Sequence, residues 1–250
     1  MLPVPTTLLL AGLLSIRQVA AHGYLSAITI GGTTYTGWLA DDYPYNPDHP
    51  DTIGWGTTVT DNGFVAPDQF GSADIICHRG STPAPIAATV AAGSTIDLTW
   101  NTWPDSHHGP VIEYMAAVPA STDWSSIDKT SLSWAKTAES GLISGSNPGT
   151  WASDQLLANS LTWTTTIPAS LAPGKYVLRH EIIALHSAGN ANGAQSYPQC
   201  INLEVTGGGS ASPGGTAATS FYTASDPGIL FNLYGEFTSY PIPGPALWTG

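Results

Sequence analysis

Short segments in which apolar and polar residues alternate recur along the chain, and this pattern restricts its fold more than any other feature. In residues 94–100, Ile96, Leu98 and Trp100 alternate with Thr and Asp, which is the period of a β-strand with one buried face. Similar β-rich segments occupy residues 24–30, 110–118, 175–185 and 201–205. Long segments rich in Gly, Pro, Asn and Asp separate them. The sequence therefore predicts an all-β protein, an antiparallel β-sandwich whose functional groups lie on long loops.

Helical signals are few and short. Residues 151–160, WASDQLLANS, predict one or two helical turns with Ser153 as the N-cap, and residues 125–132 predict another turn. We find no internal repeat, so a repeat architecture is not expected.

The N-terminus has the features of an export signal. A short apolar run at residues 8–14 is followed by Val19-Ala20-Ala21, the small residues that signal peptidase requires. Seven apolar residues are too few to span a bilayer, and no later run is long enough. We therefore expect residues 1–21 to be a secretory signal peptide, and the protein to be secreted, extracellular and without a membrane partner. Cleavage after Ala21 leaves His22 as the first residue.

The charge of the chain excludes one class of partner. The chain has 18 acidic and 6 basic residues; because Arg17 leaves with the signal, the cleaved chain carries 5 − 18 = −13. Such a surface repels nucleic acid. Only 10% of residues are charged, whereas there are 9 Trp and 10 Tyr, a composition that suits a neutral, ring-rich partner. The remaining 250 − 21 = 229 residues fit one large β domain, residues 22–250, which we expect to be a monomer.

The chain has two cysteines, Cys77 and Cys200. In an exported protein they most simply form one disulfide, and only one pairing exists. Two separate buried thiols are the alternative.

Residues 207–216, GGGSASPGGT, have the composition of a flexible linker. Only 34 residues follow it, rich in aromatic and turn residues. We interpret them as an extended arm that packs back on the sandwich, and an appended binding module is the alternative.

An N-terminal histidine can hold a metal ion in a chelate ring through its α-amino nitrogen and its imidazole. Further ligands follow in the sequence: His107 and His108 precede a Gly-Pro turn, and Tyr197 lies three residues before Cys200. Three nitrogens in a plane suit copper, with a phenol in a weak axial position. Imidazoles also suit zinc, so zinc is the alternative on ligand type.

The motifs together resemble those of the fungal lytic polysaccharide monooxygenases of auxiliary activity family 9, formerly classed as glycoside hydrolase family 61. The motifs that carry the resemblance, in their order, are the HGY start at residues 22–24, H-x-G-P at 107–110, RHEIIALH at 179–186, Q-x-Y-P at 195–198 and the IPGPALW ending. The resemblance covers essentially all of the chain after the signal. It implies an antiparallel sandwich like that of immunoglobulin or fibronectin type III domains, with one copper ion on a flat face at one end.

The resemblance also assigns the site residues. It implies that the amine and Nδ1 of His22, together with His107, hold the copper, with Tyr197 at the axial position. His108 fills the variable place of H-x-G-P. His186 and Gln195 match the outer-sphere pair that hydrogen-bonds oxygen species beside the metal.

Other aromatic and histidine side chains receive other assignments. We expect Tyr24, Tyr234 and Tyr240 to stack on pyranose rings of the substrate, with Tyr24 and Tyr234 favoured by their place in the family. His180 is expected to be a structural histidine in a strand, and His49 and His78 to be structural or exposed. The second disulfide of many relatives is absent, because VPASTDW at residues 118–124 has no cysteine. No carbohydrate-binding module is expected.

The activity that the resemblance implies is oxidative cleavage of β-1,4-glucan (cellulose), at C1, C4 or both. The reaction uses O2 or H2O2 and an external electron donor, a small reductant or cellobiose dehydrogenase. Hydrolysis is disfavoured because no pair of carboxylates stands out as acid and base. Two other hypotheses are a non-catalytic copper-binding sandwich and a glycan-binding module.

Overall fold

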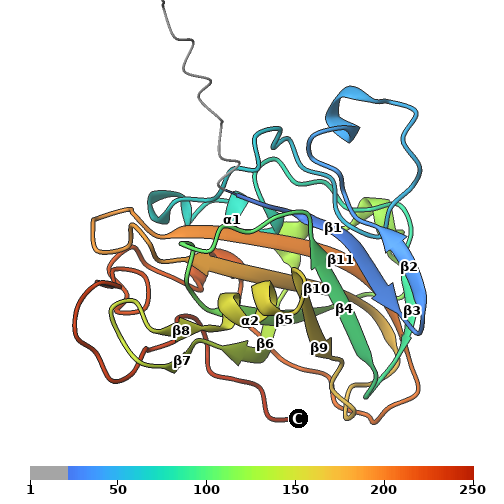
Figure 1. The fold of residues 1–250 in the computed structure, drawn as a ribbon. Helices are drawn as coiled ribbons and strands as arrows, with labels where there is room; N and C mark the ends of the chain where they lie inside the picture. Colours follow the sequence, from blue (N-terminus) through green and yellow to red (C-terminus); the bar gives the residue numbers. More distant parts are fainter. Residues whose placement is uncertain (1–21) are drawn as a thin grey trace, which may run out of the picture.

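A computed structural model describes residues 22–250 and consists mainly of two packed β-sheets (Figure 1). The expected signal peptide, residues 1–21, lies outside the described residues. One sheet has, in spatial order, the strands β2 (Thr33–Thr36), β1 (Leu25–Ile30), β4 (Thr95–Trp100) and β9 (Thr162–Thr166). The other has β3 (Ala88–Ala91), β11 (Gln195–Thr206), β10 (Gly174–Ala184), β5 (Val111–Val118) and β6 (Trp134–Ser140). A separate pair contains β7 (Leu142–Ser144) and β8 (Thr150–Trp151).

The sandwich prediction is confirmed, with one exception to its antiparallel pairing. Every ladder between named strands is antiparallel except that between β11 and β3, which is parallel. The ladder between β10 and β11 runs from Gly174 opposite Val205 to Ala184 opposite Gln195. β11 therefore begins at Gln195, six residues before the segment that alternation predicts. As a result, the Q-x-Y-P motif lies within a strand.

Helices are few, as expected. α1 (Asp74–Cys77) and α2 (Ala152–Ala158) are the α-helices of the described residues. Single 3-10 turns lie at Tyr43–Tyr45, Pro67–Gln69, Trp124–Ser126, Lys129–Ser131 and Ala218–Ser220. The predicted N-cap of α2 is wrong: the cap is Trp151, whose N–H donates to Asp154 at 2.8 Å, while the Ser153 hydroxyl accepts the N–H of Gly109 at 3.0 Å. None of the helices in residues 22–250 is long and apolar enough to cross a bilayer.

Two apolar clusters stabilise the fold. Alternation places Ile96, Leu98 and Trp100 between the two sheets. β5 has no such alternation because it is buried on both faces: Met115 faces the other sheet, whereas Ile112 lies in the second cluster. The second cluster also contains side chains from the loops and the C-terminal segment.

The C-terminal segment packs on this second cluster. Its buried members are Phe221, Tyr222, Ile229 and Leu233. Residues 207–216 are bonded to the sandwich: Ala211 donates to Ser170 O and accepts from Ala172 N, and Thr216 pairs with Trp134. The stretch that has the composition of a linker thus lies along the sandwich, because its backbone groups find partners there.

The disulfide prediction is confirmed. Cys77 at the end of α1 is bonded to Cys200 on β11, with the two Cα atoms 5.3 Å apart. The bond fixes the loop that carries α1 against β11, an inner strand of the larger sheet.

Candidate metal centre

The backbone at the start of β1 fixes the position of His22. Tyr24 N donates to Asn101 Oδ1 at 2.9 Å, and Asn101 N donates to Tyr24 O at 3.0 Å. A Cβ on Gly23 would lie 2.1 Å from Thr102 O, so only glycine allows this close approach. The HGY start therefore places the His22 ring beside the loop that follows β4.

Three aromatic side chains of the predicted set come together there. The ring centroid of His22 lies 5.6 Å from that of His107 and 5.7 Å from that of Tyr197. His186 stacks on His107 at 3.8 Å. Trp103 packs against these side chains: its ring centroid lies 5.0 Å from that of Tyr197, and its Nε1 donates to His107 O at 3.0 Å. Residues from four separate segments thus surround one small volume.

The two neighbouring histidines of H-x-G-P have different surroundings. His108 Nδ1 lies 2.8 Å from Asp154 Oδ1 on α2, so this ring is engaged away from His22. A Cβ on Gly109 would lie 1.9 Å from Ile183 O, so glycine is required where the turn meets β10. This close approach turns His107 toward His22 and His108 toward the helix.

The environment keeps the imidazoles neutral. Burial lowers the pKa of His107 most, and the nearby rings of His186, His22 and His108 add to this, so that the pKa falls to about 3. Burial also lowers the pKa of His22 and of His186. A metal needs the unprotonated imidazole, and these pKa shifts supply it at neutral pH.

Two buried ring nitrogens without hydrogen-bond partners indicate that a metal ion binds in this place. Nε2 of His107 and Nδ1 of His186 are buried and have no hydrogen-bond partner among residues 22–250. A buried nitrogen without a partner costs about 1–3 kcal/mol, which coordination of a metal by His107 would remove. No group of three or more His, Cys, Asp or Glu side chains converges in the described chain. The residues still fit copper, because the third nitrogen in the expected set is the amine of His22, which exists only after cleavage.

Tyr197 and Gln195 form a bonded pair beside these rings. The buried Tyr197 hydroxyl donates to Gln195 Oε1 at 2.8 Å. Burial raises the pKa of Tyr197, so the phenol keeps its proton. Gln195 also lies close enough to His22 to raise the pKa of its ring, against the larger lowering by burial. The bond to Tyr197 engages the amide oxygen of Gln195 and holds this side chain beside the His22 ring.

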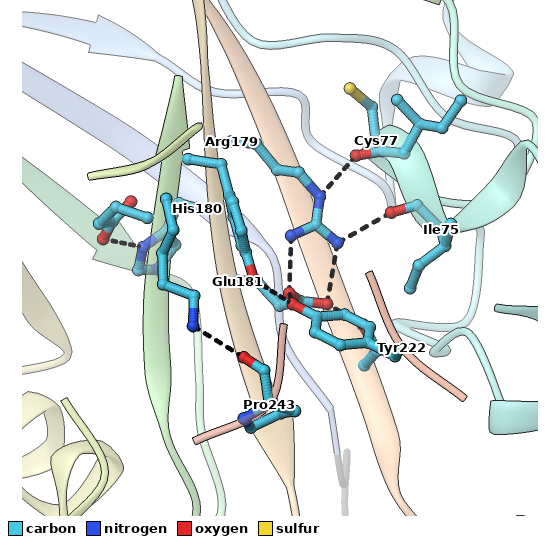
Figure 2. Close-up of polar contacts among 12 residues, drawn as sticks. Ile75, Cys77, Arg179, His180, Glu181, Tyr222 and Pro243 are labelled. Carbon is cyan, nitrogen blue, oxygen red and sulfur yellow. Dashed lines mark hydrogen bonds and ion pairs between the residues drawn. The ribbon is translucent and has the colours of Figure 1, made fainter. Parts of the chain in front are cut away.

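A buried charged network, shown in Figure 2, is bonded to the strand that carries this pair. Glu181 accepts two bonds from Arg179, at 2.6 and 2.9 Å, one from Tyr222 at 2.5 Å and one from Ser196. The Arg179 guanidinium also donates to the carbonyls of Ile75 and Ile76 in α1, at 2.9 and 2.8 Å. Ser196 stands between Gln195 and Tyr197 in the sequence, so the network fixes the strand that carries them.

Two of the three tyrosines expected to stack on the substrate are wholly or partly buried. Tyr24 is 7% exposed, and its hydroxyl donates to Asp41 at 2.5 Å. The Tyr240 ring packs 4.9 Å from Trp151, and its hydroxyl donates to Gly228 O at 2.6 Å. Tyr234 is 55% exposed, as a stacking residue requires. Burial leaves Tyr24 little ring surface for stacking, Tyr240 is partly buried, and the assignment of the stacking tyrosines stays a prediction.

The exposed aromatic residue Tyr45 was not identified from the sequence. Tyr45 is 70% exposed, the largest value among the exposed large apolar side chains. It ends the 3-10 turn Tyr43–Tyr45 in a loop that follows β2. Composition alone does not separate it from buried Tyr43, which stacks on His49 at 4.6 Å. The pattern Tyr-Pro-Tyr in a turn was the available signal, because Pro in a turn favours a surface loop.

The remaining histidines are structural, as expected. His180 is buried, accepts from Trp100 Nε1 at 2.9 Å and lies 2.7 Å from Glu113 Oε1. His78 is buried, and its Nδ1 accepts the N–H of Arg79 at 2.8 Å. Neither faces the metal centre.

Comparison with known proteins agrees with this geometry. The profile of Auxiliary Activity family 9 (formerly GH61) matches residues 22–240. AA9 family lytic polysaccharide monooxygenase F of Malbranchea cinnamomea is 62% identical over 96% of this chain and 97% of its own length. AA9 family lytic polysaccharide monooxygenase A of Thermoascus aurantiacus is 56% identical over 92% of this chain and 100% of its own.

Solved structures show the same similarity. The extended catalytic domain of H. jecorina LPMO9A superposes with a TM-score of 0.88 at 48% identity, covering 92% of both chains. The structure named HiLPMO9B gives a TM-score of 0.80 at 38% identity, covering 92% of this chain and 100% of its own. The chain therefore belongs to Auxiliary Activity family 9, the copper-dependent lytic polysaccharide monooxygenases, and is an oxidative enzyme that acts on polysaccharides.

Proposed function

We propose that the protein is secreted, is cleaved after Ala21 and oxidatively cleaves β-1,4-glucan, with cellulose as its substrate. The observation that carries this proposal is the convergence of the His22, His107 and Tyr197 rings around a buried, unpartnered Nε2 of His107. The choice of cellulose is supported by a solved relative, a cellulose-active polysaccharide monooxygenase from M. thermophila, which superposes with a TM-score of 0.77 at 33% identity.

The ligands of the single copper are assigned residue by residue. The amine and Nδ1 of His22 and Nε2 of His107 would hold it, with the Tyr197 hydroxyl as a further, weaker ligand. When bound, copper supplies one-electron chemistry toward O2 or H2O2, with electrons from an external donor such as a small reductant or cellobiose dehydrogenase. The oxidised carbon of the glucose unit is C1, C4 or both.

The chain's own groups orient and protect this chemistry. Trp103 and the core beneath it exclude water from one side of the rings. Tyr197 holds Gln195 by its amide oxygen, and the amide N–H groups of Gln195 would serve as hydrogen-bond donors beside the site. His186, stacked on His107, presents a second ring beside the same position. Tyr234 and Tyr45 offer exposed rings to the pyranose units of the substrate.

Gln195→Leu tests this proposal against a copper-storage role. A preorganised donor of this kind contributes about 10² to 10³ in rate, and Gln195 is no ligand. We expect copper affinity measured by calorimetry to stay nearly unchanged, while the yield of oxidised oligosaccharides from cellulose with ascorbate falls by about that factor. Gln155→Leu, the same change at an exposed position of α2, is the matched control and should cleave like the parent.

The other outcomes separate the alternatives. Full activity of Gln195→Leu removes Gln195 from the mechanism. A copper-loaded parent that releases no oxidised product from any β-glucan is instead a storage protein or a glycan-binding module, and the proposed function is then wrong.

A further inference from the structure

A groove follows one open side of the sandwich, between the edge strands β6 and β9. Two adjoining hollows of about 250 and 220 Å³ share Thr137 of β6 and Thr166 of β9 as lining residues, so they form one continuous depression, here called the edge groove. Water fills about 30 Å³ per molecule in the liquid, and each half therefore has room for several hydroxyl-bearing groups. None of its lining residues belongs to the metal centre.

A buried carboxylate lines the deeper half of the edge groove. Glu113 of β5 is 1% exposed, and its Oε1 lies 2.7 Å from Nδ1 of His180; Figure 2 includes the contact made by His180. Oε2 of Glu113 is buried and has no hydrogen-bond partner within residues 22–250. The indole of Trp163 lies beside the Glu113 carboxylate and partly offsets the rise of its pKa that burial causes. Because Glu113 is buried, its carboxylate belongs to the floor of the groove, and an occupant would contact the threonines and the indole rings above it.

The walls are rich in hydroxyl groups and contain two indole rings. β9 contributes Thr164, Thr165 and Thr166, and each hydroxyl both donates and accepts. Trp163 lines one half of the groove and Trp248 the other; both are partly exposed and pack against the core. Apolar ring faces beside hydroxyl groups match the two kinds of surface that a sugar unit presents.

The charge of the walls excludes anionic occupants. The two ionisable side chains that line the groove are Glu113 and Glu139, and no Lys or Arg of residues 22–250 lines it. Lys136, the nearest basic residue on β6, donates to Glu139 at 2.6 Å and to Pro243 O at 2.9 Å. A metal ion is a poor match, because Ca²⁺ takes six to eight oxygen ligands and no group of three His, Cys, Asp or Glu forms in the described chain.

We propose that the edge groove binds a single neutral glycan chain, at a site separate from the copper face. Hydroxyl groups of the glycan exchange hydrogen bonds with the threonines, and its apolar ring faces stack on Trp163 and Trp248. The choice of a glycan rests on the proposed function, which supplies the substrate class. Binding itself needs no copper chemistry, so the two can fail separately.

Filling the groove tests the proposal. Ala138 lines the groove and pairs with Glu113 across β5 and β6, so Ala138→Phe places a ring in the space of the glycan. Ala91→Phe, on the exposed side of edge strand β3 in the same sheet, is the matched control. Calorimetry with cellohexaose and xylohexaose, on copper-loaded protein without reductant, measures the affinity. We expect Ala138→Phe to weaken hexaose binding at least about tenfold, the effect of losing one central contact, and the control to bind like the parent.

A milder variant covers the case in which Ala138→Phe does not fold. Thr166→Val keeps the shape and the strand preference of an exposed position but removes a hydroxyl shared by both halves of the groove. We expect a loss of affinity of about threefold to tenfold, the effect of one neutral hydrogen bond.

Amide NMR shifts locate the bound hexaose. In the copper-free protein, the proposal predicts shifts at residues 163–166 and 137–139 that disappear in Ala138→Phe. Shifts confined to His22, His107 and residues 195–197, or unchanged affinity in both groove variants, overturn it. So does tight binding of CaCl2 or MnCl2 that Ala138→Phe abolishes while neither hexaose binds. Cellulose cleavage by the copper-loaded parent is measured separately: cleavage without groove binding refutes the groove alone, and groove binding without cleavage refutes the oxidative function alone.

Discussion

Replacing Glu181 by Gln should destabilise the protein strongly, although Gln has nearly the same shape. The Glu181 carboxylate is fully buried and is the anion opposite the buried guanidinium of Arg179. Burial lowers the pKa of Arg179, but the charge and hydrogen bonds of Glu181, together with Tyr222 and Tyr114, raise it by more, so the guanidinium stays charged. In Glu181→Gln, one accepting oxygen becomes an NH2 group, which is a hydrogen-bond donor. It then faces the N–H groups of Arg179 and the hydroxyl of Tyr222, which are also donors, so these hydrogen bonds are lost.

The magnitude follows from this burial. Removing one partner of a buried ion pair costs about 3–5 kcal/mol because the other charge stays uncompensated. For a domain of this size, about 2 °C is lost per kcal/mol, so the melting temperature should fall by about 6–10 °C. Asp61→Asn is the matched control, since Asp61 pairs with Arg79 at a similar distance of 2.9 Å but on the surface. An exposed pair contributes about 0–1 kcal/mol, so this variant should melt close to the parent.

Urea unfolding and calorimetry of Glu181→Gln, Arg179→Met and the double variant measure the effect. The double variant removes both charges, so its loss of stability should be clearly smaller than the sum of the two single losses. Additive losses, or a Glu181→Gln protein that melts within about 2 °C of the parent, would refute the reasoning that the two charges stabilise each other. Cleavage of cellulose by Glu181→Gln, measured below its melting transition, should also fall, because Ser196 loses its carboxylate partner.

Three further predictions concern the histidines. A methionine left before His22 should abolish tight copper binding, because the amine becomes a peptide nitrogen; unchanged affinity by calorimetry in the extended form would exclude the proposed chelate. His107→Ala should lose copper and most activity, whereas His108→Ala should lose mainly its contact with Asp154, and the reverse result would exchange the two assignments. Burial lowers the pKa of His78 to about 4, so the unfolded chain binds a proton that the folded chain excludes between pH 6.5 and 4. Stability from this group is complete above pH 6.5 and falls by about 1.4 kcal/mol per pH unit on acidification through that window. Urea unfolding of the copper-free protein at pH 7 and pH 5 should therefore show a smaller pH effect in His78→Asn than in the parent, and equal effects would contradict the assignment.

Alternation predicts the strands that have one buried face. The segments expected at 24–30 and 94–100 match β1 and β4 to within one residue. β9, with sequence TWTTT, lacks this signal because it is an edge strand with four threonines. Alternation does not identify the first half of β11, which contains Pro198. This proline is tolerated because the side of β11 away from β10 has only an isolated bridge there, between Ser196 and Val65, and β3 joins from Leu203 onward.

The metal ligands and the surface aromatics differ in how well sequence specifies them. A ligand set is recognisable from residue types in a fixed motif, and the motif residues His22, His107 and Tyr197 do come together. Exposure of an aromatic ring depends on what covers it. Tyr24 is covered, and its hydroxyl donates a hydrogen bond to Asp41, which lies 17 residues away in the sequence. No local sequence pattern contains that information.

Ser196 on β11 connects the buried network around Glu181 with the metal centre. Successive residues of a strand point to opposite faces, so Gln195 and Tyr197 face the metal centre while Ser196 faces the Glu181 network. Glu181 itself lies on β10, opposite Pro198 in the β10–β11 ladder. A shift of the Glu181 carboxylate thus moves Ser196, and one peptide bond on either side carries the shift to Gln195 and Tyr197. The charged network therefore affects the metal centre through the backbone of β11, whose alternating residues face the two sites. For this reason Glu181→Gln should lower cleavage although it changes none of the proposed copper ligands.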